Sequence, residues 1–120
     1  MAYKVHRGAE VTRDLGRIET YLVQTYQNLG EDDKAATSRA AVRIKEALVY
    51  MRSFVDHPHR GTEHPQLQSG LRSVTSNRFI YYFTVDDLLS DVKILAVFFG
   101  GMDHRRQILD RLQIRPRRVV

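Results

Sequence analysis

The sequence predicts a single α+β domain with the element order β-α-α-β-β-β-α, in which an antiparallel sheet packs against a hairpin of two helices. Three observations predict this fold class. The first half of the chain carries two long stripes of apolar residues at helical spacing. Three short segments rich in β-branched and aromatic residues follow in series between residues 70 and 99. A double glycine and a small basic helix then close the pattern.

The N-terminal half is expected to form an edge strand and two helices. Alternation over residues 3–6 indicates the strand, and Gly8 interrupts it. The first helix is expected to end at Gly30, which tolerates a left-handed backbone. Acidic residues at 31–33 favour the start of the second helix, where the helix dipole is positive. The predicted stripes are Val11, Leu15, Ile18, Leu22, Tyr26 and Leu29 in the first helix, and Ala41, Ile44, Leu48, Met51 and Val55 in the second.

The short connection at Gly30 implies that the two helices are antiparallel, and alanines along the second helix allow the two backbones to approach closely. A loop is expected over residues 56–65 because Pro58, Gly61 and Pro65 punctuate it. The loop also holds three histidines, His57, His59 and His64. Three imidazoles on an irregular loop are a weak signal for zinc or nickel, so we expect no metal site there.

The second half is expected to form three consecutive strands. These are residues 70–75, residues 78–85 and residues 91–99, with a polar turn at 75–77 and a stop at Asp86 and Asp87. In the middle strand one face carries Phe79, Tyr81, Phe83 and Val85, and the other carries Ile80, Tyr82 and Thr84. Since the last two strands are apolar on both faces, we expect them to form a central pair covered by helices.

A short helix over residues 104–112 is expected to close the domain, with Asp103 as its N-cap. Ile108, Leu109 and Leu112 would lie on its inner side, and Arg105, Arg106 and Arg111 would face outward. The domain therefore spans residues 1–112, and residues 113–120 form a basic tail that we expect to be flexible.

Composition narrows the class of protein. The 120 residues carry a formal net charge of +5 and no cysteine, so disulfides and cysteine-based metal sites or nucleophiles are excluded. No apolar run approaches the length of a membrane span and no signal peptide is visible, so we expect a cytoplasmic protein without a membrane partner. Six arginines stand against two aspartates over residues 101–120. This basic end favours an acidic partner or serves as a solvated tail.

The chemistry visible in the sequence is cationic. The chain lacks GxxxxGK, GxGxxG, GxSxG and HExxH motifs, so no cofactor and no common hydrolase site is predicted. Guanidinium groups that converge at one end of the sheet would bind phosphate, and within that group only His104 titrates near neutral pH. The alternative is that the arginines are ion-pair partners of nearby carboxylates and His104 is a surface residue. The candidate residues for binding a target are Arg72, Arg78, His104, Arg105 and Arg106.

Four segments in this order resemble the RelE/ParE superfamily of type II toxin–antitoxin toxins. They are PHRG at 58–61, SGLRS at 69–73, NRFIYYFTV at 77–85 and VKILAVFFGGMDHRRQIL at 92–109. The resemblance covers nearly all of residues 3–112. It implies the RelE/ParE-like fold and one of two activities, because RelE-like members cut messenger RNA on the ribosome whereas ParE-like members act on DNA gyrase.

Departures from the ribonuclease pattern make the resemblance closer to ParE. Met102 stands where a catalytic arginine is expected, Ile108 stands where a tyrosine is expected, and the first of the three strands offers Arg72 but no lysine. The resemblance therefore implies a toxin without catalytic residues that inhibits DNA gyrase. The alternatives are a RelE-like ribosome-dependent endonuclease and an inactive toxin-like binding module. Direct binding to nucleic acid is left open.

The resemblance also implies a protein partner, a cognate ParD-like antitoxin that wraps the toxin between its helices and its sheet. Large aromatic residues on or beside the helical stripes would suit such a groove, with ordinary core packing as the alternative for each. The candidates for binding the antitoxin are Tyr21, Tyr26, Tyr50 and Phe54.

Overall fold

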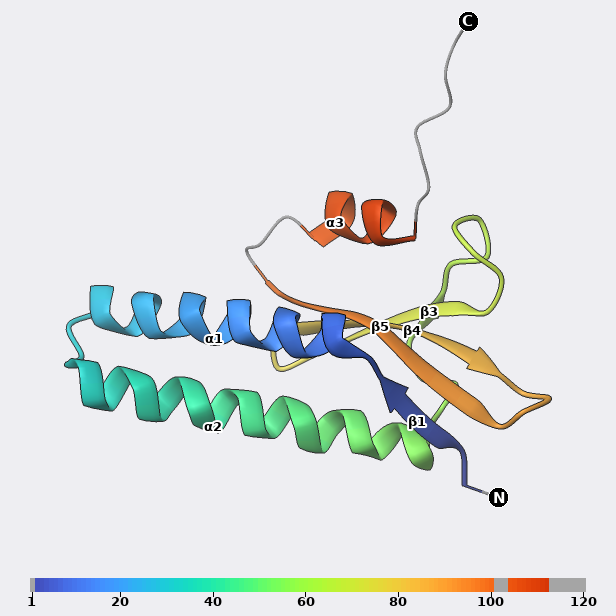
Figure 1. The fold of residues 1–120 in the computed structure, drawn as a ribbon, viewed down its shortest axis with the longest axis horizontal. Helices are drawn as coiled ribbons and strands as arrows, with labels where there is room; N and C mark the ends of the chain where they lie inside the picture. Colours follow the sequence, from blue (N-terminus) through green and yellow to red (C-terminus); the bar gives the residue numbers. More distant parts are fainter. Residues whose placement is uncertain (1, 101–103, 113–120) are drawn as a thin grey trace, which may run out of the picture.

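The structure, a computed structural model, describes residues 2–100 and 104–112, together with all of their side chains except those of residues 104 and 105. Predictions about Met102, Asp103 and the tail at 113–120 therefore lie outside the described residues. The predicted β-α-α-β-β-β-α order is confirmed, with one extra short strand and a 3₁₀ turn (Figure 1). The elements are β1 Lys4–Arg7, α1 Ala9–Asn28, α2 Asp33–Arg52, η1 Ser53–Val55, β2 Thr62–Glu63, β3 Leu71–Ser76, β4 Phe79–Asp86, β5 Asp91–Phe99 and α3 His104–Arg111.

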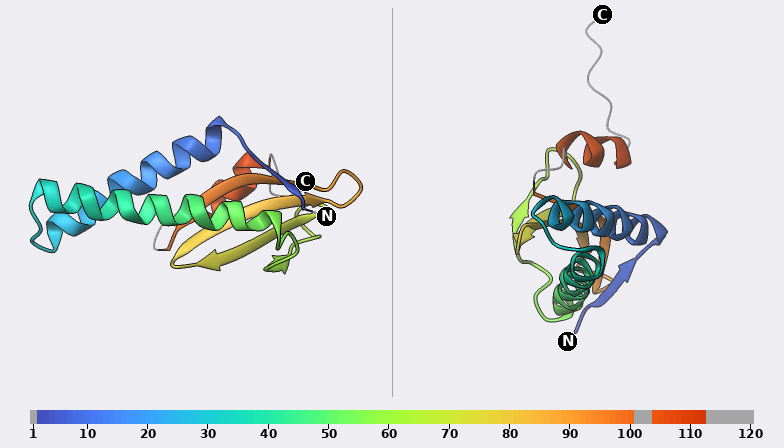
Figure 2. Two further views of the ribbon diagram at one scale, coloured as in Figure 1. Left: turned by 90° about the horizontal axis from the view of Figure 1, so that it is seen from below. Right: turned by 90° about the vertical axis from the view of Figure 1, so that its left-hand side faces the viewer.

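The helices α1 and α2 form the expected antiparallel hairpin along one side of the molecule (Figures 1 and 2). Gly30 joins them with φ at +102°, a conformation in which a Cβ atom would be strained. Asp32 caps α2, since its carboxylate accepts the backbone N–H of Ala35 at 2.8 Å. The predicted stripe of α1 is buried from Val11 to Tyr26, but Leu29 follows the last helical residue and is 74% exposed.

The inner face of α2 agrees with the predicted stripe at Ile44, Leu48 and Met51, which belong to the core or pack against it. The other three buried positions are alanines, and Ala41, which was predicted to be buried, is exposed. Because the inner face carries small side chains, the helices pack closely, and the larger Val42 and Val49 lie on the outer side with more than half of their surface exposed. The buried residues of α2 are Ala36, Ala40, Ala47 and Met51.

The strands form one sheet in the order β1-β5-β4-β3-β2. The three expected strands pair antiparallel as β3-β4-β5, and β2 extends them antiparallel at one edge. The expected edge strand β1 pairs parallel with β5, so the sheet is mixed and not wholly antiparallel as predicted. The loop predicted over residues 56–65 contains β2, because Thr62 and Glu63 pair with Ser73 and Arg72.

A bulge in β5 decides which side chains meet the helices. Tyr82 pairs with Ala96 and Phe83 pairs with Ile94, so Leu95 is left as an extra residue. The alternation of β5 side chains between the two faces of the sheet therefore breaks at Leu95. The main core between the helical hairpin and the sheet includes Phe79, Tyr81, Phe83, Val92, Ile94, Val97 and Phe99, and a second cluster on the opposite face includes Leu71, Tyr82, Ala96, Phe98 and Ile108.

The last helix, α3, covers part of the second face of the sheet, apart from the helical hairpin (Figure 2). Ile108 is its anchor at 1% exposure, and Leu112 packs beside it at the end of the helix. Within the described part of the chain, no helix is long and apolar enough to cross a membrane.

Candidate functional site

The turn between β3 and β4 presents the first candidate residue, Arg78. This two-residue turn, Asn77–Arg78, has positive φ at both positions, +55° and +71°, where a hairpin of this kind favours Asn-Gly. Two contacts hold it in place: Arg43 of α2 donates to the Asn77 carbonyl at 2.7 Å, and the Gly100 N–H donates to the Arg78 carbonyl at 2.8 Å. The Arg78 guanidinium lies 5.1 Å from the centre of the Phe99 ring and the side chain is exposed.

The second candidate, Arg72, does not converge with Arg78. It lies six residues earlier, on β3 and opposite Phe83, whereas Arg78 lies in the turn at the far end of the same hairpin. Its guanidinium is used by its own loop, since it binds Glu63 at 2.7 Å and donates to the carbonyls of His59 and Arg60. The predicted convergence is therefore wrong for Arg72, which has the alternative role of an ion-pair partner.

Only part of the basic group on α3 can be placed. The backbone of His104 and Arg105 begins the helix, but their side chains lie outside the described residues. Arg106 is exposed, as predicted. Arg111, in contrast, faces inward and forms a bidentate ion pair with Asp14 of α1 through contacts of 2.5 and 2.9 Å. This pair attaches α3 to α1 rather than adding to an outer basic surface.

Asp14 was missed as the buried partner of Arg111, although its spacing could have identified it. It lies three residues after Val11 and four before Ile18, on the buried stripe of α1. The side chain is 3% exposed and also accepts the backbone N–H of Val97 at 3.0 Å. Hydrogen bonding to Asp14 is the main reason that the pKa of Arg111 is raised above its ordinary value. A carboxylate within an apolar stripe indicates a specific cationic partner.

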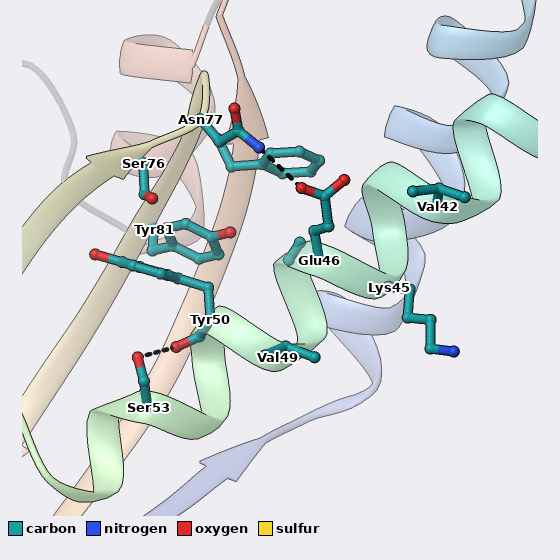
Figure 3. Close-up of a pocket in the computed structure, with 11 residues that line it drawn as sticks. Val42, Lys45, Glu46, Val49, Tyr50, Ser53, Ser76, Asn77 and Tyr81 are labelled. Atoms are coloured by element: carbon teal, nitrogen blue, oxygen red, sulfur yellow. Dashed lines mark hydrogen bonds between the residues drawn. The ribbon is translucent and has the colours of Figure 1, made fainter.

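A groove of about 570 Å³ lies between α2 and the β3–β4 hairpin (Figure 3). Its walls are mostly apolar, and Lys45 and Glu46 are its charged residues. The Tyr50 ring packs against the Tyr81 ring at 5.0 Å between centres, with the two planes tilted by 32°. Burial raises the pKa of the Tyr81 hydroxyl well above its ordinary value. The lining residues are Val42, Lys45, Glu46, Ala47, Val49, Tyr50, Ser53, Ser76, Asn77, Phe79 and Tyr81.

The four aromatic candidates for partner binding divide into three groups. Tyr50 lines the groove and remains accessible. Phe54 and Tyr26 belong to the core, at 0% and 6% exposure, so they stabilise the fold instead of forming accessible anchors. Tyr21 is 38% exposed but lies against Phe99 at 6.0 Å, away from the lining of the groove.

The loop at residues 56–65, which we call the histidine loop, is held by hydrogen bonds. Among residues 2–100 and the described side chains of α3, no cluster of three or more side chains could hold a metal ion. His59 Nε2 lies 2.6 Å from Asp87 Oδ1, and the Tyr3 hydroxyl donates to the same oxygen at 2.8 Å. The Tyr3 and His59 hydrogen bonds lower the pKa of Asp87, and the bond to Asp87 raises the pKa of Tyr3. His64 contacts the Ser73 hydroxyl at 2.6 Å. These contacts connect the N-terminus, the loop and the β4–β5 turn.

Comparisons with known proteins give a likeness in structure only. No protein-family model matches the chain, and neither does the sequence of any curated protein. A chain of the chromosomal ParDE toxin–antitoxin system from P. aeruginosa superposes with a TM-score of 0.62 at 15% identity, over 82% of this chain and 96% of that one. A chain of the toxin–antitoxin complex RelBE2 from Mycobacterium tuberculosis gives 0.53 at 14% identity, over 82% and 99%. The chain has the RelE/ParE-like fold.

Proposed function

We propose that this chain is the toxin of a type II toxin–antitoxin system, neutralised by a cognate antitoxin and acting, like ParE, on DNA gyrase without catalysing a reaction. The observation that carries the proposal is the fold. The alignment spans nearly the whole of two chains from toxin–antitoxin systems, so this chain shares their fold over nearly their full length.

The groove beside α2 supports an antitoxin partner. Val42 and Val49 expose apolar surface at its rim, and Tyr50 provides an accessible aromatic side chain within it (Figure 3). An apolar groove with few charges suits the apolar face of an amphipathic helix or a wrapped segment. In this proposal Tyr50 is the antitoxin contact among the four predicted aromatic residues, and Phe54 supports it from the core by ring packing at 5.6 Å.

The gyrase assignment is favoured over messenger RNA cleavage by the larger TM-score for the ParDE chain. It also agrees with the departures of the sequence from the ribonuclease pattern. The proposed target surface includes Arg78 and the basic side of α3, where Arg106 is exposed. Arg72 stays in the proposal as a residue that orders the histidine loop, since its guanidinium is already bound by Glu63 and two carbonyls.

The test of the target begins with expression of the chain with and without its neighbouring open reading frame. Growth should stop only when the chain is expressed alone. Purified protein should then inhibit gyrase supercoiling and leave translation extracts unaffected. Codon-positioned cuts in translating extracts, abolished by Arg78→Ala, would instead establish the ribonuclease. Unaffected growth would establish an inactive binding module.

The target surface has its own test. Replacing Arg105 and Arg106 together by Glu should remove toxicity and leave the circular dichroism spectrum unchanged. Unchanged toxicity with normal folding would assign the two arginines to the solvated surface.

The test of the groove uses a matched pair of charge substitutions. Val49→Glu places a carboxylate at the rim, where burial by a partner is costly. Leu88→Glu makes the same kind of change in the β4–β5 turn, at a side chain that is 97% exposed and absent from the groove. We expect Val49→Glu to abolish neutralisation while toxicity persists, and Leu88→Glu to be neutralised normally. Equal neutralisation of both variants would place the antitoxin contact elsewhere.

A further inference from the structure

A second groove, of about 420 Å³, lies between β1 and the C-terminal end of α2 (Figure 1). At one end of it the Tyr3 N–H donates to the Val55 carbonyl at 3.1 Å, which joins the two elements. Its lining shares no residue with that of the groove at the β3–β4 hairpin. We call it the β1–α2 groove, and its lining residues are Tyr3, Lys4, Val5, Arg7, Leu48, Met51, Arg52, Val55 and Ile94.

The floor of the β1–α2 groove is apolar because of how its residues are spaced along the chain. Leu48, Met51 and Val55 recur at steps of three and four, so they share one side of α2 and of the 3₁₀ turn η1 that follows. Met51 and Ile94 are 2% and 1% exposed and form the floor. Side chains of β1 and α2 therefore meet around the groove without filling it.

The charged residues of the lining are all cations. They are exposed, and none of them has a carboxylate partner within the described part of the chain. Since no acidic residue lines the groove, the charge at its rim is positive, and an anion is attracted there. These cations are Lys4, Arg7 and Arg52.

Carboxylates outside the lining distinguish the two ends of the groove. At the Tyr3 end, Asp87 accepts the Tyr3 hydroxyl at 2.8 Å. The acidic residues near this end are Asp56, Asp86, Asp87 and Asp91. At the other end, the nearest carboxylate along the chain from Arg7 is that of Glu10, which is paired with Arg111 at 3.3 Å. An anionic group is therefore favoured at the Arg7 end.

The backbone of β1 adds hydrogen-bond donors to the same groove. Lys4 donates to the Ser90 carbonyl at 2.9 Å, so its N–H faces β5. Because successive N–H groups of a strand point to opposite edges, those of Val5 and Arg7 face away from β5, on the side that the Tyr3 N–H also faces. No strand pairs with this edge in the described part of the chain. The open donor at Arg7 lies where the charge also favours an anion.

An apolar floor with cations and open donors at its rim suits a small amphiphilic anion. The groove has the volume of a small-molecule site, which is about 300–1,000 Å³. An added peptide strand would need about five or six residues. From Tyr3 to Arg7, β1 spans only about 13 Å at about 3.3 Å per residue, and Val5 and Arg7 are its open positions.

We propose that the β1–α2 groove binds a small carboxylate with an unbranched apolar tail. The carboxylate contacts Arg7, with Arg52 on the opposite wall adding to its attraction, and the tail covers Met51 and Ile94. This inference goes beyond the proposed function, because the ligand is a small molecule and its site lies apart from the groove assigned to the antitoxin. A ligand that touches both walls also stabilises the attachment of β1 to α2.

The first test titrates the full chain with decanoate by isothermal titration calorimetry in about 50 mM salt. We expect a Kd of about 0.1 mM and a rise in melting temperature at saturation. Butyrate has the same charge and a shorter tail, and decyltrimethylammonium has the same tail and the opposite charge. Both should bind at least about tenfold more weakly than decanoate. Equal binding of either probe would overturn the proposal, because the tail or the charge would then contribute nothing.

The second test uses two pairs of substitutions that remove the same net charge. Arg7→Gln combined with Arg52→Gln should weaken decanoate binding at least about tenfold. The control combines Arg13→Gln with Lys34→Gln, at two exposed cations that do not line the groove, and it should change the affinity less than about twofold. Equal weakening by the two pairs would mean that net charge alone attracts decanoate, and the site would be rejected.

The third test locates the probe by two-dimensional amide NMR of the full chain. Decanoate should shift the amide resonances of Val5 and Arg7 and leave that of Tyr50 unchanged. Shifts centred on Tyr50, or no binding of decanoate at all, would overturn the proposal. If decanoate fails and a hexapeptide of alternating glutamate and valine shifts Val5 and Arg7, the open edge of β1 binds a peptide strand instead.

Discussion

The ion pair between Asp14 and Arg111 gives the sharpest test of how the C-terminal helix is held. Arg111→Met keeps much of the length and apolar stem of the side chain but removes both contacts to the Asp14 carboxylate. Asp14 is left 3% exposed, with the Val97 N–H as its remaining hydrogen bond and Arg17 at 3.9 Å as its remaining cation. A buried charge that loses its partner costs about 3–5 kcal/mol. We therefore expect the free energy of unfolding to fall by about 3 kcal/mol.

The expected loss has an upper limit set by α3 itself. If the cost of the unpaired carboxylate exceeds the free energy that docks α3, the helix will detach, Ile108 will become exposed, and Asp14 will meet solvent. Urea unfolding followed by circular dichroism measures the global loss, and hydrogen exchange of the amides at 106–111 measures detachment. Asp14→Asn combined with Arg111→Met should recover part of the loss, because the amide can still accept the Val97 N–H without a buried charge.

Arg106→Met is the control, since this exposed arginine lies on the same helix and should change stability by less than about 0.5 kcal/mol. The reasoning would be refuted if Arg111→Met cost no more than Arg106→Met and left exchange in α3 unchanged. The reasoning would also be refuted if the losses in the free energy of unfolding caused by Asp14→Asn and by Arg111→Met simply added up in the double variant.

Three further outcomes follow from the structure. Gly61→Ala should lower the free energy of unfolding, measured in urea, by more than about 2 kcal/mol, because φ is +80° and a Cβ would lie 2.1 Å from the Ser73 carbonyl oxygen. The control is Gly16→Ala on α1, where a Cβ meets no atom within 4 Å, and it should be neutral or stabilising. Ala40→Leu should cost about 1–3 kcal/mol by overpacking the α1–α2 contact, and exposed Ala41→Leu should not. Because the pKa of Asp87 is lowered in the folded protein, its carboxylate stabilises the fold at pH values above the unfolded pKa of about 4. This stabilisation is lost as the pH falls through the folded pKa. The melting temperatures of wild type and Asp87→Asn should therefore differ at pH 6 and converge once the pH has fallen through the folded pKa of Asp87, and a constant difference would contradict this.

Much of the fold was predictable because its signals are local. The stripe of α1, the left-handed Gly30 and the acidic start of α2 each depend on residues within one or two helical turns. The strands other than β2 were predicted to within one or two residues for the same reason, with the β3–β4 turn falling at Asn77–Arg78 and not at 75–77. The face of α2 was predicted correctly at Ile44, Leu48 and Met51 and wrongly at Ala41, since alanines are apolar on every side of this helix and periodicity alone did not show which of them meet α1.

The candidate site was predictable only as a set of residue types. Arg106 was correctly expected to be exposed, and Tyr50, a candidate for binding a partner, lines a groove. Arg72 and Arg111 looked equally available in sequence, yet each is used by a carboxylate from another element. Guanidinium groups do not reveal their partners through spacing along one strand or helix, because those partners come from other parts of the chain.

The sequence by itself determined the helical hairpin, the three strands in series between residues 70 and 99 and the basic character of the C-terminal end, all through composition, periodicity and turn chemistry. Only the tertiary structure decided that Asp14 meets Arg111 across 97 positions of sequence, that Leu95 bulges out of register, and that Phe99 gathers Tyr21, Arg43 and Arg78. These outcomes depend on which surfaces pack together, and packing is settled by the fit of whole elements and not by neighbouring residues.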